Sequence, residues 1–384
     1  MSEINDNANI EINNNENEAS APQYSWGKDN RPDESESAVM IRRKIKKGYN
    51  WAGSMIIWQQ IIAIVIMMII ISLVSAQMVI PIIAEHPEYD SMQLSAALQQ
   101  ELMANGDMVF INAVSTIAAN IISLIIICLV KKQFKLKNTF GKIQVPASSA
   151  ALAAVGILGI QGASILIQSL IMGLTGYSGI NEAAASMFSF SDDITMNIIL
   201  FIYMVIAAPI LEELMFRGAV MNLLAPVNRT FALFASAMFF GLMHCNFNQM
   251  FNGFLLGLLL GYIALKSGSV ISAIICHMTA NLNSFIVGYI FEYKLANSIG
   301  AEAAIQGEYI TFAVEMIIGI IALVLLLKKH GKITNNDIIV TNYSYAMEDS
   351  EEKKLTWQAL LKCPTFWVSA VYCILTAATL VTAL

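Results

Sequence analysis

The chain alternates long apolar segments with shorter polar ones, and the apolar segments have the length of membrane-spanning helices. Uncharged apolar runs of about 18 residues or more recur along it, and about 20 such residues form a helix that crosses the roughly 30 Å of hydrocarbon in a bilayer. The strands of a membrane barrel would instead alternate apolar and polar positions, and we find no such pattern. We therefore predict an all-α fold, a polytopic transmembrane helical bundle of about eight or nine spans. The expected spans are residues 51–76, 108–130, 148–174, 196–225, 230–247, 250–267, 269–290, 309–327 and 364–384.

Composition agrees with a membrane setting. Hydrophobic residues make up 57% of the 384 residues and charged residues only 13%, whereas a typical soluble domain carries about 25% charged residues. The net charge of −6 comes mostly from the polar segments and points to no partner, so we expect no nucleic acid. The cysteines lie in or beside apolar segments without C-x-x-C spacing, so we interpret them as small core residues. They are Cys128, Cys245, Cys276, Cys363 and Cys373.

The first 40 residues have a different composition from the rest of the chain. They include SEINDNANIEINNNENEAS, which is rich in Asn and Glu. Such a segment buries too little apolar surface to fold alone, and it lacks the apolar region of a cleavable signal peptide. We expect residues 1–40 to be a disordered spacer, and binding of a partner by this tail is the alternative.

Basic residues are distributed unevenly between the two sets of loops that nine spans would define. Of the 22 Lys and Arg residues, only Lys294 and Arg217 fall outside one of these sets and the tail that leads into it. Cytoplasmic loops of membrane proteins carry the excess of basic residues. We therefore predict a multi-pass protein whose N-terminus is cytoplasmic.

Three charges interrupt the apolar run from Ile194 to Leu224, in the stretch APILEELMFRGAV. A charge in hydrocarbon costs about 2.5–3.5 kcal/mol on insertion scales, so an intramembrane acid is a functional hypothesis by default. Glu213 and Arg217 are four residues apart and can pair on one helix face, which would also suit a purely structural role. Glu212 is turned about 100° away from Glu213, and the structural explanation accounts for it less well. Pro209, just before the acids, predicts a kink.

Two later spans contain histidines beside amides. His244 lies in FFGLMHCNFNQ, and His277 with Asn281 lies in CHMTANLNSF. A single buried histidine is more often a core group than a catalyst. Two histidines that come after a buried acid pair in the sequence favour a catalytic site. From the helical rise, Glu212 and His244 lie roughly 20 Å and His277 roughly 12 Å from the cytoplasmic ends of their helices. We expect these residues to converge in the middle of the membrane.

These residue types suit the hydrolysis of a peptide bond. A carboxylate in a partly dry pocket can take a proton from water, and an imidazole or amide donor can stabilise the oxyanion that forms on the carbonyl. Glu212, His244 and His277 are also plausible ligands for a divalent metal such as zinc. The chain has no H-E-x-x-H sequence, so the usual zincin arrangement is not expected. No Ser-His-Asp or Cys-His set is evident.

The three motifs resemble those of the CPBP family of intramembrane proteases, which includes CAAX prenyl proteases and Abi proteins that process bacteriocins or give immunity to them. EELMFR is similar to its E-E-x-x-x-R motif, FGLMH to F-x-x-x-H, and HMTAN to H-x-x-x-N. The order and spacing agree over about residues 194–290. The resemblance implies an intramembrane endopeptidase, of either the metallo or the glutamate type, that acts on membrane-associated peptides or proteins.

The resemblance also implies a role for each motif residue. Glu212 would activate water with support from Glu213, and Arg217 would hold the acid pair. His244 and His277 would orient the water or bind a metal. Asn281 would help to stabilise the oxyanion.

With this resemblance, we divide the chain into four segments. The cytoplasmic tail of residues 1–40 is followed by N-terminal transmembrane helices at 41–190 and a CPBP-like catalytic core at 191–290. The remaining transmembrane helices, with a cytoplasmic loop, occupy 291–384. Nothing in the sequence is specific to eukaryotes, so we expect a bacterial plasma membrane.

Two other functions fit parts of the sequence. The extra spans and the tail would suit a non-catalytic bacteriocin-immunity or membrane-peptide-binding protein. The buried charges would suit a transporter with a proton or ion path, but transporters often contain internal repeats and we find no convincing repeat. The protease remains the preferred hypothesis.

Overall fold

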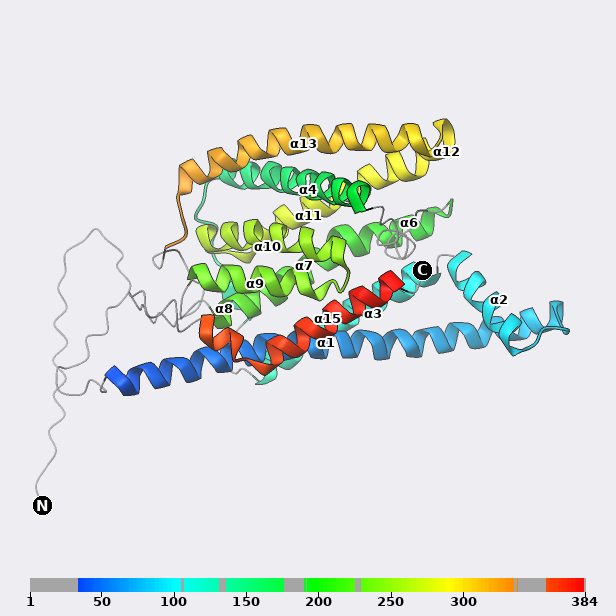
Figure 1. Cartoon of the computed structure of the whole chain (residues 1–384), viewed down its shortest axis with the longest axis horizontal. Helices are drawn as coiled ribbons and strands as arrows, with labels where there is room; N and C mark the ends of the chain where they lie inside the picture. The colour runs from blue at the N-terminus through cyan, green and yellow to red at the C-terminus, as the bar shows by residue number, and fades with distance from the viewer. Residues whose placement is uncertain are drawn as a thin grey trace, which may run out of the picture. The chain divides into compact units, whose positions relative to one another are not determined.

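The computed structural model describes residues 34–104, 107–130, 136–175, 190, 192–224, 229–334, 337 and 357–382. Every regular element in these ranges is a helix (Figure 1), so the predicted all-α polytopic bundle is confirmed. The N-terminal elements are α1 (Glu34–Glu85), α2 (Ser91–Ala104), α3 (Asp107–Val130), η1 (Leu136–Thr139) and α4 (Ala147–Thr175). The central ones are α6 (Ile194–Phe201), η2 (Ile202–Ala207), α7 (Ala208–Glu213), η3 (Leu214–Val220), α8 (Met221–Leu224), α9 (Arg229–Met243), α10 (Phe247–Ser267) and α11 (Val270–Val287). The C-terminal ones are η4 (Gly288–Leu295), α12 (Ala296–Ile299), α13 (Ala301–His330) and α15 (Pro364–Thr382).

The described helices include the long apolar segments that the hydropathy pattern predicted, but α1, with 52 residues, extends well beyond its expected span. Seven helical segments of the described chain are long and apolar enough to cross a membrane. Two further apolar helices, at Arg229–Met243 and Pro364–Thr376, are shorter and correspond to the fifth and ninth expected spans. A total of eight or nine spans is therefore compatible with the structure, and the chain is a multi-pass membrane protein.

The structure adds an extension of α1 and one further helix to what the sequence pattern suggested. Residues 1–33 of the predicted tail lie outside the described residues, but residues 34–40, which we expected to be disordered, begin α1. The reason is that no Gly or Pro lies between Pro32 and Gly48, so helix propagates back from the span. The polar segment that follows α1 forms α2, which we had expected to be a loop. Residues 42–384 group as one compact unit, within which the divisions at 190 and 290 stay predictions.

Helices α4 and α13 pack closely along their length (Figure 1) because glycines remove the side chains between them. A Cβ added to Gly159 would lie 2.5 Å from the Cα of Gly319, and one added to Gly162 would lie 2.4 Å from the carbonyl oxygen of Phe312. Small residues allow this approach, and van der Waals packing then holds helices together in lipid. Helix α4 also contacts α10 and α11, which carry part of the candidate site.

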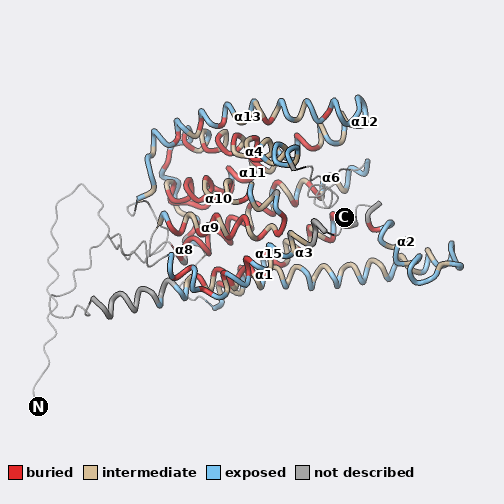
Figure 2. Tube along the Cα trace, viewed as in Figure 1, coloured by how far each residue is buried: buried red, intermediate tan, exposed pale blue. Residues whose placement is uncertain are grey.

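Helices α9 and α10 form a second close pair. A glycine face on α10 allows α9 to approach closely. A Cβ on Gly257 would lie 2.9 Å from the Cα of Ala237, and one on Gly261 would lie 2.4 Å from the side chain of Leu233. Buried residues are concentrated along α7 to α11 (Figure 2), so the three motifs lie in the most enclosed part of the bundle.

The span that carries the acids is interrupted by two wider, π-helical turns. The amide of Ala208 donates to the carbonyl of Tyr203, and the amide of Met221 donates to the carbonyl of Phe216. Both bonds span five residues rather than the four of an α-helix. The kink predicted at Pro209 stays a prediction; the structure has a π-helical segment, η2, that ends two residues before the proline.

Candidate active site

The acid pair lies on α7 and is enclosed by protein. Glu213 is fully buried, Arg217 is 1% exposed and Glu212 is 8% exposed. Arg217 follows Glu213 by one helical turn, and its Nη1 donates to Glu213 Oε1 at 2.7 Å. The ion pair predicted from the i, i+4 spacing is therefore confirmed.

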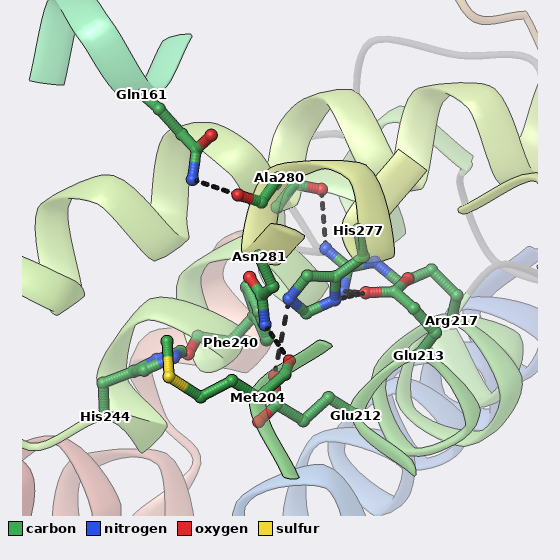
Figure 3. Close-up of polar contacts among 11 residues, drawn as sticks. Gln161, Met204, Glu212, Glu213, Arg217, Phe240, His244, His277, Ala280 and Asn281 are labelled. Carbon is green, nitrogen blue, oxygen red and sulfur yellow. Dashed lines mark hydrogen bonds and ion pairs between the residues drawn. The ribbon is translucent and has the colours of Figure 1, made fainter. Parts of the chain in front are cut away.

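The guanidinium of Arg217 joins three elements of the site. Its Nη2 donates to the carbonyl oxygen of Gly257 on α10 at 3.0 Å, and its central carbon lies 4.7 Å from the centre of the Phe240 ring on α9. These contacts tie α10 and α9 to the acid pair (Figure 3). A charge-assisted hydrogen bond in a dry interior is strong, so this group fixes the position of Glu213.

His277 on α11 lies between the two acids (Figure 3). Its Nδ1 is 2.9 Å from Glu213 Oε1, and its Nε2 is 3.8 Å from Glu212 Oε2. The shorter contact has hydrogen-bond length and the longer one does not. Because a carboxylate only accepts hydrogen bonds, Nδ1 carries the proton of the shorter bond, and Nε2 faces Glu212.

The start of α11 is set by a tight turn that places His277 at this depth. Gly268 ends α10 with a left-handed conformation, at φ 69°, which glycine adopts without steric cost. Ser269 then caps α11 by accepting a hydrogen bond from the amide of Ile271. The turn makes α10 and α11 antiparallel neighbours, and so brings His277 to the acids.

His244 lies just past the end of α9, not within a span. We expected the span 230–247 to continue through it, but the helix ends at Met243, and Cys245 takes a left-handed conformation at φ 52°. Asn246 favours this break because its side chain caps α10 through the amide of Gln249 and also donates to the carbonyl of His244. The Nδ1 of His244 donates to the carbonyl of Phe240 at 2.9 Å.

Phe240 is a residue of the site that the sequence reasoning did not assign. Its ring is 1% exposed, and both imidazoles meet it edge to face, with ring centres 5.1 Å away for His244 and 5.6 Å away for His277. Arg217 lies over the same ring. The signal was the F-x-x-x-H motif, which places this ring one turn before His244.

Asn281 contacts the backbone of the acid-bearing span. Its Nδ2 donates to the carbonyl oxygen of Met204 at 2.8 Å. In an α-helix this carbonyl would accept from Ala208, but that amide bonds Tyr203 instead. In a π-helix it would accept from residue 209, which is a proline and has no N–H. Asn281 therefore satisfies a carbonyl that the π turn and Pro209 leave free.

Gln161 is a further polar residue that the sequence reasoning missed. It projects from α4, and its Nε2 donates to the carbonyl of Ala280 at 3.1 Å and to Ser284 Oγ at 3.0 Å. Both acceptors lie on α11, on either side of Asn281. The signal in the sequence was a lone amide within an apolar span.

The structure brings together most, but not all, of the predicted metal ligands. His277 contacts both acids, whereas the Nδ1 of His244 is bonded to Phe240. No group of three His, Cys, Asp or Glu side chains in the described chain is arranged to hold a metal ion. No step below therefore uses a metal, and the metal stays an untested prediction.

Comparison with known families agrees with this site. Residues 194–283, about a quarter of the chain, match the family described as Rce1-like, type II CAAX prenyl endopeptidase Rce1-like. The resemblance predicted from the three motifs is therefore confirmed, and the matched segment contains all six predicted site residues. At the level of the family, this match supports a CAAX-protease-like intramembrane endopeptidase. Searches of curated proteins and of solved structures found no match.

Proposed function

We propose that this protein hydrolyses peptide bonds in membrane-associated peptides or proteins with a water molecule that Glu212 activates. The observation that carries the proposal is the difference between the two acids. The side chain of Glu213 is 0% exposed and bonds both Arg217 and His277. The side chain of Glu212 is 10% exposed and, among the described residues, pairs only with His277, over the longer distance. Glu213 thus bonds Arg217 and His277, and Glu212 is the acid that can contact water.

In the proposed reaction Glu212 takes a proton from water as the water oxygen attacks the carbonyl carbon of the peptide. The carbon becomes tetrahedral and its oxygen becomes an oxyanion. The C–N bond then breaks, and the proton held by Glu212 passes to the leaving nitrogen. The products are a carboxylic acid and an amine, which exchange a proton to become a carboxylate and an ammonium group, so atoms and charge balance without a further reactant. A positioned general base contributes about 10²–10⁴-fold to such a step.

The neighbouring residues have separate roles in this scheme. The Nε2 of His277 faces Glu212 and keeps that carboxylate directed at the water. His244 orients the water through its own Nε2, since its Nδ1 is occupied by Phe240. An amide group has two N–H donors, so Asn281 can use one on Met204 and offer the other to the oxyanion.

The test compares purified wild type with Glu212→Gln on a library of membrane-peptide substrates. We expect the variant to fold with an unchanged melting temperature and to lose cleavage by about 10²–10⁴-fold. Each protein is assayed with and without a chelator, because chelator sensitivity would support a metal. If Glu212→Gln still cuts at the wild-type rate, the proposal is wrong. If neither protein cuts and both give the same cellular phenotype, the peptide-binding or immunity function is favoured.

The cellular setting is part of the proposal. The excess of basic residues in one set of loops supports a cytoplasmic N-terminus, and we assign the protein to a bacterial plasma membrane. A cysteine introduced into the tail, in a chain whose own cysteines are replaced, should react with a membrane-impermeant maleimide only after the cells are opened. Labelling of intact cells would reverse the orientation.

A further inference from the structure

Three side-chain amides form a buried chain outside the segment that matches the protease family. Gln59 and Gln60 lie on α1 and Asn120 lies on α3, each within an expected span. Gln59 is 3% exposed and Asn120 is fully buried. Polar side chains at this depth are costly and usually functional, and neither these residues nor their helices have a role in the reaction proposed above.

The hydrogen bonds of these amides connect α3, through α1, to the end of α9. Gln59 Nε2 donates to Asn120 Oδ1 at 3.1 Å. Gln60 Nε2 donates to Gln59 Oε1 at 2.9 Å and to the carbonyl oxygen of Met243 at 2.8 Å. Asn120 and Gln59 therefore hold the Gln60 amide in place, and Gln60 bonds the last residue of α9.

The carbonyl of Met243 needs such a partner because the helix ends there. The last four carbonyls of a helix have no partner within the helix. Here the carbonyl of Phe240 accepts from the ring of His244, that of Gly241 from the amide of His244, and that of Leu242 from the amide of Cys245. The carbonyl of Met243 is the fourth, and its bond comes from Gln60.

The carbonyl of Met243 and the amide of His244 belong to one planar peptide group. A bond to this carbonyl therefore fixes the plane from which the His244 side chain departs. We infer that Gln60, supported by Gln59 and Asn120, is a positioning residue for His244. This inference rests on the proposed function for its effect on rate, but its effect on the imidazole can be measured separately.

The first experiment replaces the amide with an apolar side chain of similar length. Gln60→Met removes the donor, and Gln77→Met is the matched control, because Gln77 is an exposed residue on the same helix. We expect Gln60→Met to lower kcat by about 10- to 100-fold, as a small misplacement of a catalytic group does, with KM changed less than about threefold. Gln77→Met should match the wild type in both.

The second experiment observes His244 directly. The chain has only four histidines, so ¹⁵N-labelled imidazoles can be resolved by NMR, and His244→Gln identifies the His244 signal by its loss. We expect Gln60→Met to shift the Nδ1–H signal of His244 and to leave that of His277 in place. An unchanged His244 signal and kcat in folded Gln60→Met would overturn the inference. A shifted signal in a protein that cuts no substrate would support it and count against the proposed function instead.

Gln60→Glu provides a second variant in case Gln60→Met does not fold. A protonated carboxyl can donate to the carbonyl of Met243, whereas the ionised form can only accept. The activity of Gln60→Glu relative to wild type should therefore fall as the pH rises. A ratio that does not change with pH would contradict the role of the donor.

Discussion

Helices α4 and α13 and helices α7 and α11 are neighbours in one bundle, but different forces hold each pair. Glycines bring the backbones of α4 and α13 together, so that a single added Cβ would collide with the opposite helix. Between α7 and α11 the contact is polar, with Glu213 bonded to His277 and held by Arg217. Close packing is sufficient to hold helices together in lipid. The comparison indicates that the buried charges serve a purpose other than assembly.

The first test removes the cation from the Glu213–Arg217 ion pair. Arg217→Met leaves Glu213 without its strongest partner in a dry interior, and breaking a buried ion pair on one side costs about 3–5 kcal/mol. We expect this loss in the free energy of unfolding in mixed micelles. The double variant Glu213→Gln with Arg217→Met should recover part of it, because no uncompensated charge remains. A loss below about 1 kcal/mol would mean that the pair contributes little.

The second test enlarges a glycine at the contact between α4 and α13. Gly159→Leu must push α4 away from α13, because even a Cβ would lie 2.5 Å from Gly319 Cα, and overpacking typically costs about 1–3 kcal/mol. Gly173→Leu is the matched control on the same helix, since a Cβ there meets nothing within 4 Å. Unfolding in the same micelles should separate the two variants. Equal stabilities would show that the close approach of α4 and α13 is not required.

The third test, with the smallest expected loss of stability, compares two neighbouring phenylalanines of α9. Phe240→Leu removes a ring that contacts both imidazoles and Arg217, and we expect it to lose roughly 1–2 kcal/mol of stability together with most of the cleavage. Phe239→Leu is the control, because Phe239 is equally buried but faces Phe366 on α15. It should lose similar stability and keep its cleavage rate once folded. Equal rates for the two variants would remove Phe240 from the site.

The sequence predicted those parts of the site that follow from helical spacing. Glu213 and Arg217 are four residues apart, so their pairing could be predicted without a structure. The convergence of His277 on the acids followed from its depth in an antiparallel span. The F-x-x-x-H motif also placed Phe240 near His244, although its contact with three polar groups depends on how α7, α9 and α11 meet.

The sequence did not predict contacts that depend on free backbone groups. Asn281 bonds the carbonyl of Met204 because a π turn and Pro209 together leave it without a partner. Gln60 bonds the carbonyl of Met243 because α9 ends earlier than its apolar pattern does. In both cases the acceptor is a peptide group whose availability depends on the local helical register, and side-chain patterns carry little information about that.

The π-helical segment η2 has a consequence for how insertions and deletions act on this protein. A π turn contains one residue more than the α-helical turn it replaces, and each residue turns a helix by about 100°. Because the wider turn absorbs its extra residue, loss of one residue between Ile202 and Ala207 would restore a regular helix and leave Glu212 and Glu213 directed at His277. A regular helix that kept every residue of this segment would instead rotate the two acids by roughly that angle. The chain would keep its composition, its hydropathy and its three motifs in order. A relative with the same motifs and the same number of residues, but a regular helix at this point, would therefore present its acids to a different neighbour.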